Sequence, residues 1–134
     1  MRHAGGEVPL QVADPGLKRH MAPLLNAGTD VLGRALVYPN GPPHMTVHMV
    51  ELEPGEESGW HEHPVPLFCQ ILAGEFTVDY GSKGVQRFRV GDTLMEAQNW
   101  PHNARNLGLS VARVLAVYIG SSEYPTLVRV PGPL

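Results

Sequence analysis

Prolines and glycines divide this 134-residue chain into pieces that are too short for anything but strands. There are 13 prolines and 15 glycines, and both residue types interrupt regular structure. The runs between them are apolar or alternating, and the chain lacks the sustained 3.6-residue period of a helix. The expected strands are Val31–Tyr38, Met45–Leu52, Leu67–Ala73, Phe76–Tyr80, Val85–Val90, Thr93–Ala97, Val111–Ile119 and, at an edge, Thr126–Val130. Many short strands between such turns predict an all-β sandwich or barrel.

The first thirty residues lie outside this succession of strands. Met1–Asp30 contains three prolines, and only Leu17–Leu25 within it has the pattern of a helical turn or two. We expect an N-terminal arm over residues 1–30 and a single barrel domain over residues 31–134. The apolar residues Val8, Leu10 and Val12 alternate as in an edge strand, and sheet edges need cover. We therefore expect a homodimer.

Composition and charge exclude several classes of partner. Hydrophobic residues make up 43% of the chain and charged residues 17%, which is typical of a globular protein. The net charge of −3 and the absence of a basic cluster argue against nucleic acid. Apolar runs such as Val114–Ile119 are too short to span a membrane. The single cysteine, Cys69, excludes an intrachain disulfide. With no signal segment at the N-terminus, we expect a cytoplasmic protein.

Three histidines have a spacing that predicts a metal site. Gly55 precedes the pair His61 and His63, and Gly91 precedes His102. Side chains two residues apart on a strand share a face, so the pair projects together and His102 joins it from another strand. Three neutral imidazoles with open coordination positions are typical of a working metal site. The histidines without such spacing are His3, His20, His44 and His48.

The first histidine segment resembles the first motif of the cupin family. That motif reads Gly, five residues, His-x-His, three or four residues, Glu, six residues, Gly. Gly55, His61, His63 and Gly74 match it, whereas Leu67 stands where the glutamate is usual.

The second segment resembles the second cupin motif, which reads Gly, five residues, Pro-x-Gly, two residues, His, three residues, Asn. Gly91, His102 and Asn106 match, while Ala97 and Asn99 replace the proline and glycine. The resemblance covers most of the chain and implies the double-stranded β-helix, the cupin jelly-roll barrel.

Leucine at position 67 implies the three-histidine subset of cupins, which includes thiol and β-diketone dioxygenases. The expected cofactor is a divalent transition metal, with iron preferred and zinc, nickel or manganese as alternatives. Without the glutamate, three imidazoles leave the ion's double charge uncompensated, which favours an anionic, chelating substrate. The alternative interpretation of Leu67 is a cupin that has lost its metal and kept the fold.

Several residues near the motifs are candidates for the pocket. Glu96 precedes His102 by six residues and is the candidate general base, or else an outward-facing surface charge. On the strand that begins at Leu67, Cys69 and Ile71 share a face with it. Phe68 and Met95 are other expected walls, and Arg105 and Asn106 are expected to fix a turn. Trp60 and Trp100 either form walls of the pocket or, as we favour, pack at the barrel mouth.

These residues leave three functions open. The first is a small metal-dependent dioxygenase that acts on a small anionic or chelating substrate. The second is a Lewis-acid isomerase or lyase on the same metal site. The third is a non-catalytic small-molecule binding cupin, because one fold hosts many activities.

Overall fold

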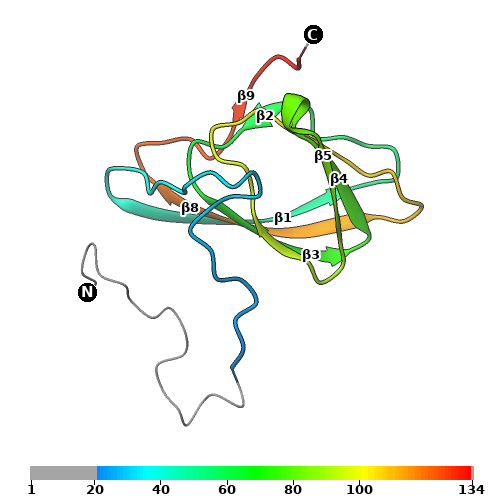
Figure 1. Ribbon diagram of the computed structural model, residues 1–134, viewed down its shortest axis with the longest axis horizontal. Helices are drawn as coiled ribbons and strands as arrows, with labels where there is room; N and C mark the ends of the chain where they lie inside the picture. The colour runs from blue at the N-terminus through cyan, green and yellow to red at the C-terminus, as the bar shows by residue number, and fades with distance from the viewer. Residues whose placement is uncertain (1–20, 134) are drawn as a thin grey trace.

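The computed structural model describes residues 21–133, and Figure 1 shows that they form a barrel-like arrangement of strands with little other regular structure. The predicted Val8–Val12 edge strand and residues 17–20 of the Leu17–Leu25 turn lie outside these residues, and residues 21–25 form no helical turn. The elements are β1 (Pro43–Leu52), β2 (His61–Glu62), β3 (Leu67–Ala73), β4 (Glu75–Asp79), the short 3₁₀ turn η2 (Gly81–Lys83), β5 (Val85–Arg89), β6 (Thr93–Met95), β7 (Asn103–Arg105), β8 (Ala112–Ser121) and β9 (Val128–Arg129). The all-β prediction is confirmed.

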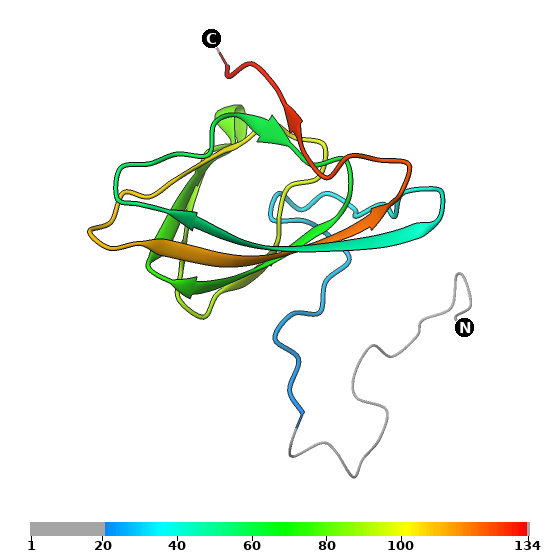
Figure 2. The same cartoon turned by 180° about the vertical axis from the view of Figure 1, so that it is seen from behind.

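The strands form three antiparallel sheets. The largest has the order β1-β8-β3-β6, a second has the order β5-β4-β7, and the pair β2-β9 lies at one end. Figures 1 and 2 show the first two sheets facing one another, with β9 beside β2 near the C-terminal end of the chain. Among residues 21–133, no helix is long and apolar enough to cross a membrane.

Strand β8 organises the largest sheet because it pairs on both sides. It runs against β1 over ten residue pairs, from Pro43 opposite Ser121 to Leu52 opposite Ala112. Its other neighbour is β3, whose register shifts between Ile71 and Ala73. At the end of β3 the backbone of Gly74 has a φ of +65°, and a Cβ there would lie 2.7 Å from the carbonyl oxygen of Val111. Glycine is therefore required for this turn.

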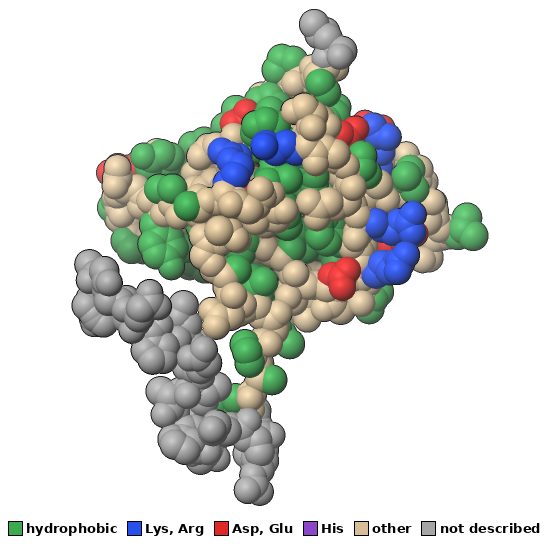
Figure 3. All heavy atoms as spheres, viewed as in Figure 1, with side chains coloured by type: hydrophobic (Ala, Val, Ile, Leu, Met, Phe, Trp, Pro, Cys, Tyr) green, Lys and Arg blue, Asp and Glu red, His purple; other side chains and the backbone are tan. Residues whose placement is uncertain are grey.

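The interior between the two larger sheets is filled by alternate side chains. On β3, Leu67, Cys69 and Ile71 are buried, whereas Phe68 and Gln70 are only half-buried, as the period of two predicts. Strands β4 and β8 alternate in the same way. On the outside, the face in Figure 3 shows basic side chains in small groups separated by hydrophobic and other side chains.

The predicted strand Val31–Tyr38 is wrong. Residues 31–33 instead form a turn, because the Asp30 carboxylate accepts hydrogen bonds from the backbone N–H groups of Leu32 and Arg34. Further along, the side-chain amide of Gln98 takes the place of a neighbouring strand. It accepts from the Val37 N–H and donates to the Val37 carbonyl. Local hydrogen bonds to Asp30 and tertiary ones to Gln98 thus satisfy this backbone without a sheet.

Other boundaries differ less from the predictions. Strand β7 was not expected, and β9 is shorter than the predicted Thr126–Val130. The described part of the arm contacts the barrel, since the Thr93 hydroxyl donates to the Leu24 carbonyl at 2.6 Å. Asn99, at the position where the second motif usually has glycine, has a φ of +55°. Asparagine tolerates this left-handed conformation better than most residues.

Candidate metal centre

Backbone pairing brings the three motif histidines together. The N–H of His61 donates to the carbonyl of His102 at 3.0 Å, and the N–H of His102 donates back at 2.9 Å. Such a hydrogen-bonded pair holds both side chains on the same side. His63 follows two residues after His61 on that face. The ring centroids are 4.5 to 5.0 Å apart, and one ring nitrogen from each residue lies within 4.8 Å of the others.

Each imidazole is oriented by a backbone carbonyl. The Nδ1 atoms of His61, His63 and His102 lie 2.7, 2.8 and 2.8 Å from the carbonyl oxygens of Gly59, Thr126 and Trp100. A carbonyl oxygen only accepts, so each Nδ1 carries the hydrogen and, in the neutral ring, each Nε2 keeps its lone pair. This arrangement orients and tunes histidine ligands in metal sites. The donor set therefore fits a divalent transition metal.

Burial keeps two of the three rings neutral at physiological pH. Desolvation, followed by the charge of His102, lowers the pKa of His63 to about 3. The same two causes, with a smaller contribution from the guanidinium of Arg129, lower the pKa of His61 to about 4. Neutral imidazole is the form that binds a metal ion, so these rings need not lose a proton first.

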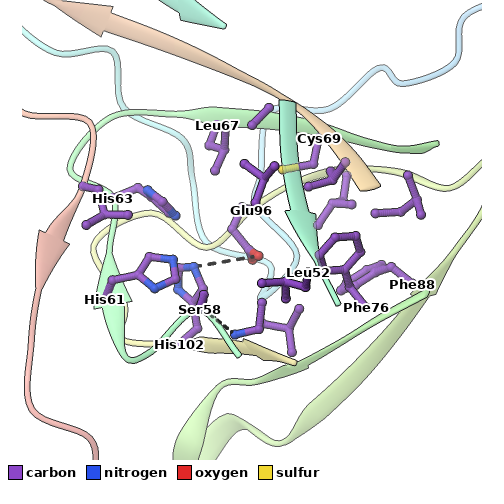
Figure 4. A pocket seen from close by; sticks show the side chains of 18 of the residues that line it. Leu52, Ser58, His61, His63, Leu67, Cys69, Phe76, Phe88, Glu96 and His102 are labelled. Carbon is purple, nitrogen blue, oxygen red and sulfur yellow. Dashed lines mark hydrogen bonds and ion pairs between the residues drawn. The ribbon is translucent and has the colours of Figure 1, made fainter. Parts of the chain in front are cut away.

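Glu96 lies beside the histidines, just past the end of β6. Its Oε1 atom accepts a 2.5 Å hydrogen bond from the Tyr80 hydroxyl and a 2.8 Å bond from the Ala97 N–H. Its Oε2 atom lies 3.8 Å from Nε2 of His102. Figure 4 shows the carboxylate directed toward the imidazoles. The outward-facing alternative for Glu96 is therefore wrong, since the residue is only 7% exposed.

Tyr80 is a residue that the sequence reasoning missed. It is fully buried, and desolvation, followed by the charge of Glu96, raises its pKa far above the ordinary value. The hydroxyl therefore remains a donor and holds Oε1 of Glu96 in place. Period-two alternation from Phe76 through Val78 to Tyr80 was the available signal, because it places all three side chains on the inner face.

The histidines and Glu96 line one cavity of about 280 Å³ inside the barrel. Figure 4 shows Leu67 near the histidines, and Phe76 and Phe88 farther away, beyond Glu96. Burial raises the pKa of the Cys69 thiol well above its usual range, so this side chain acts as a small hydrophobe. The apolar part of the wall includes Val50, Leu52, Ile71, Phe76, Val78, Phe88, Leu94 and Val114.

Phe68 and Met95, which were expected as walls, do not line the cavity. Trp60 and Trp100 do not line it either, which agrees with the favoured alternative of packing outside the pocket. Trp100 packs outside it, with its indole N–H donating to the Tyr80 carbonyl at 2.8 Å. The turn role of Asn106 is as predicted. Its amide nitrogen donates to the carbonyls of Leu52 and Ser110, and its oxygen accepts from the Gly108 N–H. Arg105 instead pairs with Asp79 at 3.6 Å.

Two further residues near the histidines had no sequence signal. Asn103 is fully buried, and its side-chain oxygen accepts from the Gly59 N–H at 2.9 Å. It thereby fixes the carbonyl that orients His61. Arg129, on β9, lines the cavity and is the Cα partner of His61 in the β2-β9 ladder. Both depend on contacts between segments far apart in the chain.

Comparison with known proteins places this geometry in a family. The family model described as "Cupin domain" matches residues 48–118, which is more than half of the chain. It includes all three histidines. None of the curated proteins compared with the chain matches it.

Solved structures share the fold at low sequence identity. An oxalate oxidase has a TM-score of 0.56 and 23% identity over 65% of this chain and 46% of its own. An oxalate decarboxylase from Lactobacillus farciminis has a TM-score of 0.56 and 21% identity, over 64% and 26%. The DMSP lyase DddQ from Ruegeria pomeroyi DSS-3 has a TM-score of 0.56 and 23% identity, over 64% and 43%. The chain thus spans less than half the length of each. The predicted jelly-roll fold is confirmed.

Proposed function

Since the chain belongs to the cupin family, we propose that it is an iron-dependent dioxygenase acting on a small anionic or chelating organic substrate. His61, His63 and His102 hold the metal in this proposal. The observation that supports it best is the set of three carbonyl-oriented imidazoles around one centre. Leu67, which lines the same cavity, adds no fourth protein ligand, so substrate and dioxygen find open positions.

The residues around the centre have distinct roles in this proposal. A bound ferrous ion supplies the redox chemistry toward dioxygen. Oε2 of Glu96 accepts a proton from the bound substrate, because Oε1 is already occupied by two donors. The apolar wall excludes water from the reacting groups, which strengthens every electrostatic interaction among them.

A second candidate is a Lewis-acid isomerase or lyase that uses zinc, nickel or manganese on the same histidines. The position of Glu96 favours it, because a buried carboxylate 3.8 Å from His102 is placed to take a proton from a C–H acid. A metal held by His61, His63 and His102 would supply Lewis acidity toward the substrate in this candidate, and no oxygen would be consumed.

Elemental analysis of untagged protein, purified without added metal, tests the metal site. We expect one metal ion per chain in the wild type, loss of that ion in His102→Ala, and retention in the control His44→Ala. His44 lies at an exposed position on β1. Full metal content in folded His102→Ala would show that the assignment of ligands is wrong.

Oxygen dependence then separates the two candidate reactions. The dioxygenase requires iron and consumes oxygen in proportion to turnover of a chelating carboxylate or diketone. Turnover that continues without oxygen would contradict the dioxygenase and favour the Lewis-acid enzyme. Metal binding without turnover, either with or without oxygen, would favour the third function, a non-catalytic small-molecule binding cupin.

We also propose a homodimer and a cytoplasmic location. The outer face of the edge strand β1 exposes Met45, Val47 and Met49 to 56%, 57% and 51%. These residues lie opposite Ile119, Val117 and Leu115 of β8. An apolar sheet face of this kind supports packing against a second copy. Sedimentation of the full chain at micromolar concentration should give the dimer mass, and a monomer mass would contradict the proposal. The lone buried thiol of Cys69 is compatible with a reducing compartment.

A further inference from the structure

We propose that Arg129 is a specificity-determining residue that selects a monocarboxylate with a compact apolar body as the substrate of this centre. The inference rests on the proposed function and deepens it, because the metal site by itself does not distinguish among anions. It is argued from the position of the guanidinium, its fixation, its charge balance and the shape of the cavity.

Strand β9 places Arg129 beside the metal ligands. In the β2-β9 ladder Arg129 lies directly opposite His61, and directly opposed side chains on antiparallel strands project to the same side. Arg129 accordingly lines the cavity that the three histidines line. Among the described residues of that lining, it is the only lysine or arginine.

Arg129 is at an exposed position of β9, and one nitrogen of its guanidinium is bound by the turn that precedes β2. Its Nη1 atom donates to the Ser58 carbonyl. Gly59 makes room for it, because a Cβ at this residue would lie only 2.9 Å from Nη1. The Nε and Nη2 donors have no hydrogen-bond partner among residues 21–133. Two adjacent guanidinium donors suit the two oxygens of a carboxylate.

The charge of Arg129 is not balanced by the protein. Arg105 pairs with Asp79 and Arg113 with Glu51, and Arg87 and Arg89 share Glu75. By contrast, no carboxylate of the described chain lies within ion-pair distance of Arg129. With a divalent ion bound, the ion and Arg129 together bring three positive charges to the site, and Glu96 brings one negative charge. The site therefore keeps an excess of two positive charges. This excess attracts an anion.

The other end of the cavity restricts the rest of the substrate. Figure 4 shows Phe76 and Phe88 beyond Glu96, away from the histidines, and Leu52 and Ile71 line the same cavity. A second charge or a hydroxyl there would lose its hydration without gaining a partner. A cavity of about 280 Å³ accommodates a small aromatic or branched aliphatic body. A dicarboxylate or a sugar acid therefore fits poorly.

Calorimetric titration of the zinc-loaded protein tests this inference without turnover. The probes are benzoate, benzamide and pentanedioate. The proteins are wild type, Arg129→Gln, Arg129→Lys and the control Arg87→Gln, whose side chain lies outside the cavity lining. We expect wild type to bind benzoate more tightly than pentanedioate. Arg129→Gln should bind benzoate about 10- to 100-fold more weakly, the range of a charge-assisted hydrogen bond, with benzamide affinity and zinc content unchanged. Arg129→Lys should recover part of the loss, and Arg87→Gln should behave as wild type.

Unchanged benzoate affinity in zinc-loaded Arg129→Gln would overturn the inference and leave the metal centre standing. Equal loss for benzoate and benzamide would also overturn it, because that result indicates a structural role for Arg129. Tighter binding of pentanedioate than of benzoate would overturn the inference that the substrate has a compact apolar body. If the wild type binds no metal, the proposed function fails. The same titrations are then made with metal-free protein. A preference for benzoate that depends on Arg129 would support the inference about Arg129, and the absence of that preference would refute it.

Discussion

The two depressed histidine pKa values predict an unusual acid sensitivity of the metal-free protein. His63 is 3% exposed, and its pKa is about 3 in the folded protein against an ordinary value of 6.5. Between these values the unfolded chain binds a proton that the folded chain does not. The free energy of unfolding therefore falls as the pH falls from about 6.5 toward about 3.

The magnitude follows from the same values. At pH 7.5 His63 is neutral in both states and contributes almost nothing. At pH 5 the unfolded form is protonated and the folded form is not, which lowers the stability by about 2 kcal/mol at 1.36 kcal/mol per pH unit. His61, with a pKa of about 4, contributes a similar loss. The two together amount to roughly 4 kcal/mol, a large part of a typical domain's stability.

Urea unfolding in the presence of a chelator measures this effect, at pH 7.5 and at pH 5, in wild type and His63→Asn. Asparagine keeps a side-chain N–H close to the position from which Nδ1 of His63 donates to the Thr126 carbonyl. Any packing effect of the substitution appears at both pH values and cancels in the difference. We expect the variant to lose about 2 kcal/mol less than wild type on acidification. An equal loss in both proteins would refute the reasoning that burial keeps His63 neutral.

Three further substitutions test the surroundings of the centre. Leu67→Glu adds an anionic ligand, so calorimetry should show tighter metal binding and weaker benzoate binding. It also buries a carboxylate, so the urea midpoint of the metal-free protein should fall. Unchanged affinities would show that Leu67 does not face the metal. Tyr80→Phe should cost about 1–3 kcal/mol in urea unfolding, because buried Oε1 of Glu96 loses a donor; wild-type stability would contradict this role. Gly74→Ala should lower the free energy of unfolding by about 1–3 kcal/mol, because φ is +65° and a Cβ would lie 2.7 Å from the Val111 carbonyl oxygen. An unchanged melting temperature would contradict this backbone strain.

Period-two alternation made part of this protein predictable from local sequence. It placed His61 beside His63, and it placed Leu67, Cys69 and Ile71 on the inner face of β3. Both statements depend only on the geometry of a single strand. The spacing of the motif glycines added the expectation that His102 joins the pair, and the resemblance to cupins supplied the fold.

Local patterns were insufficient where a segment finds its hydrogen bonds far away in the chain. Val31–Tyr38 has the composition of a strand, but Gln98, which is 61 residues from Val37, binds both the N–H and the carbonyl of Val37 from outside any sheet. Glu96 had two interpretations because its orientation depends on Tyr80, which is sixteen residues away.

The position of Arg129 was decided only by the tertiary structure. The pairing of β9 with β2 joins residues separated by more than sixty positions. This pairing brings the guanidinium of Arg129 next to Gly59, where a Cβ would leave too little room for it. The sequence determined which side chains share a strand face, because neighbouring peptides set that geometry. Which faces meet around one cavity depends on the closure of the barrel, and closure is a property of all the strands together.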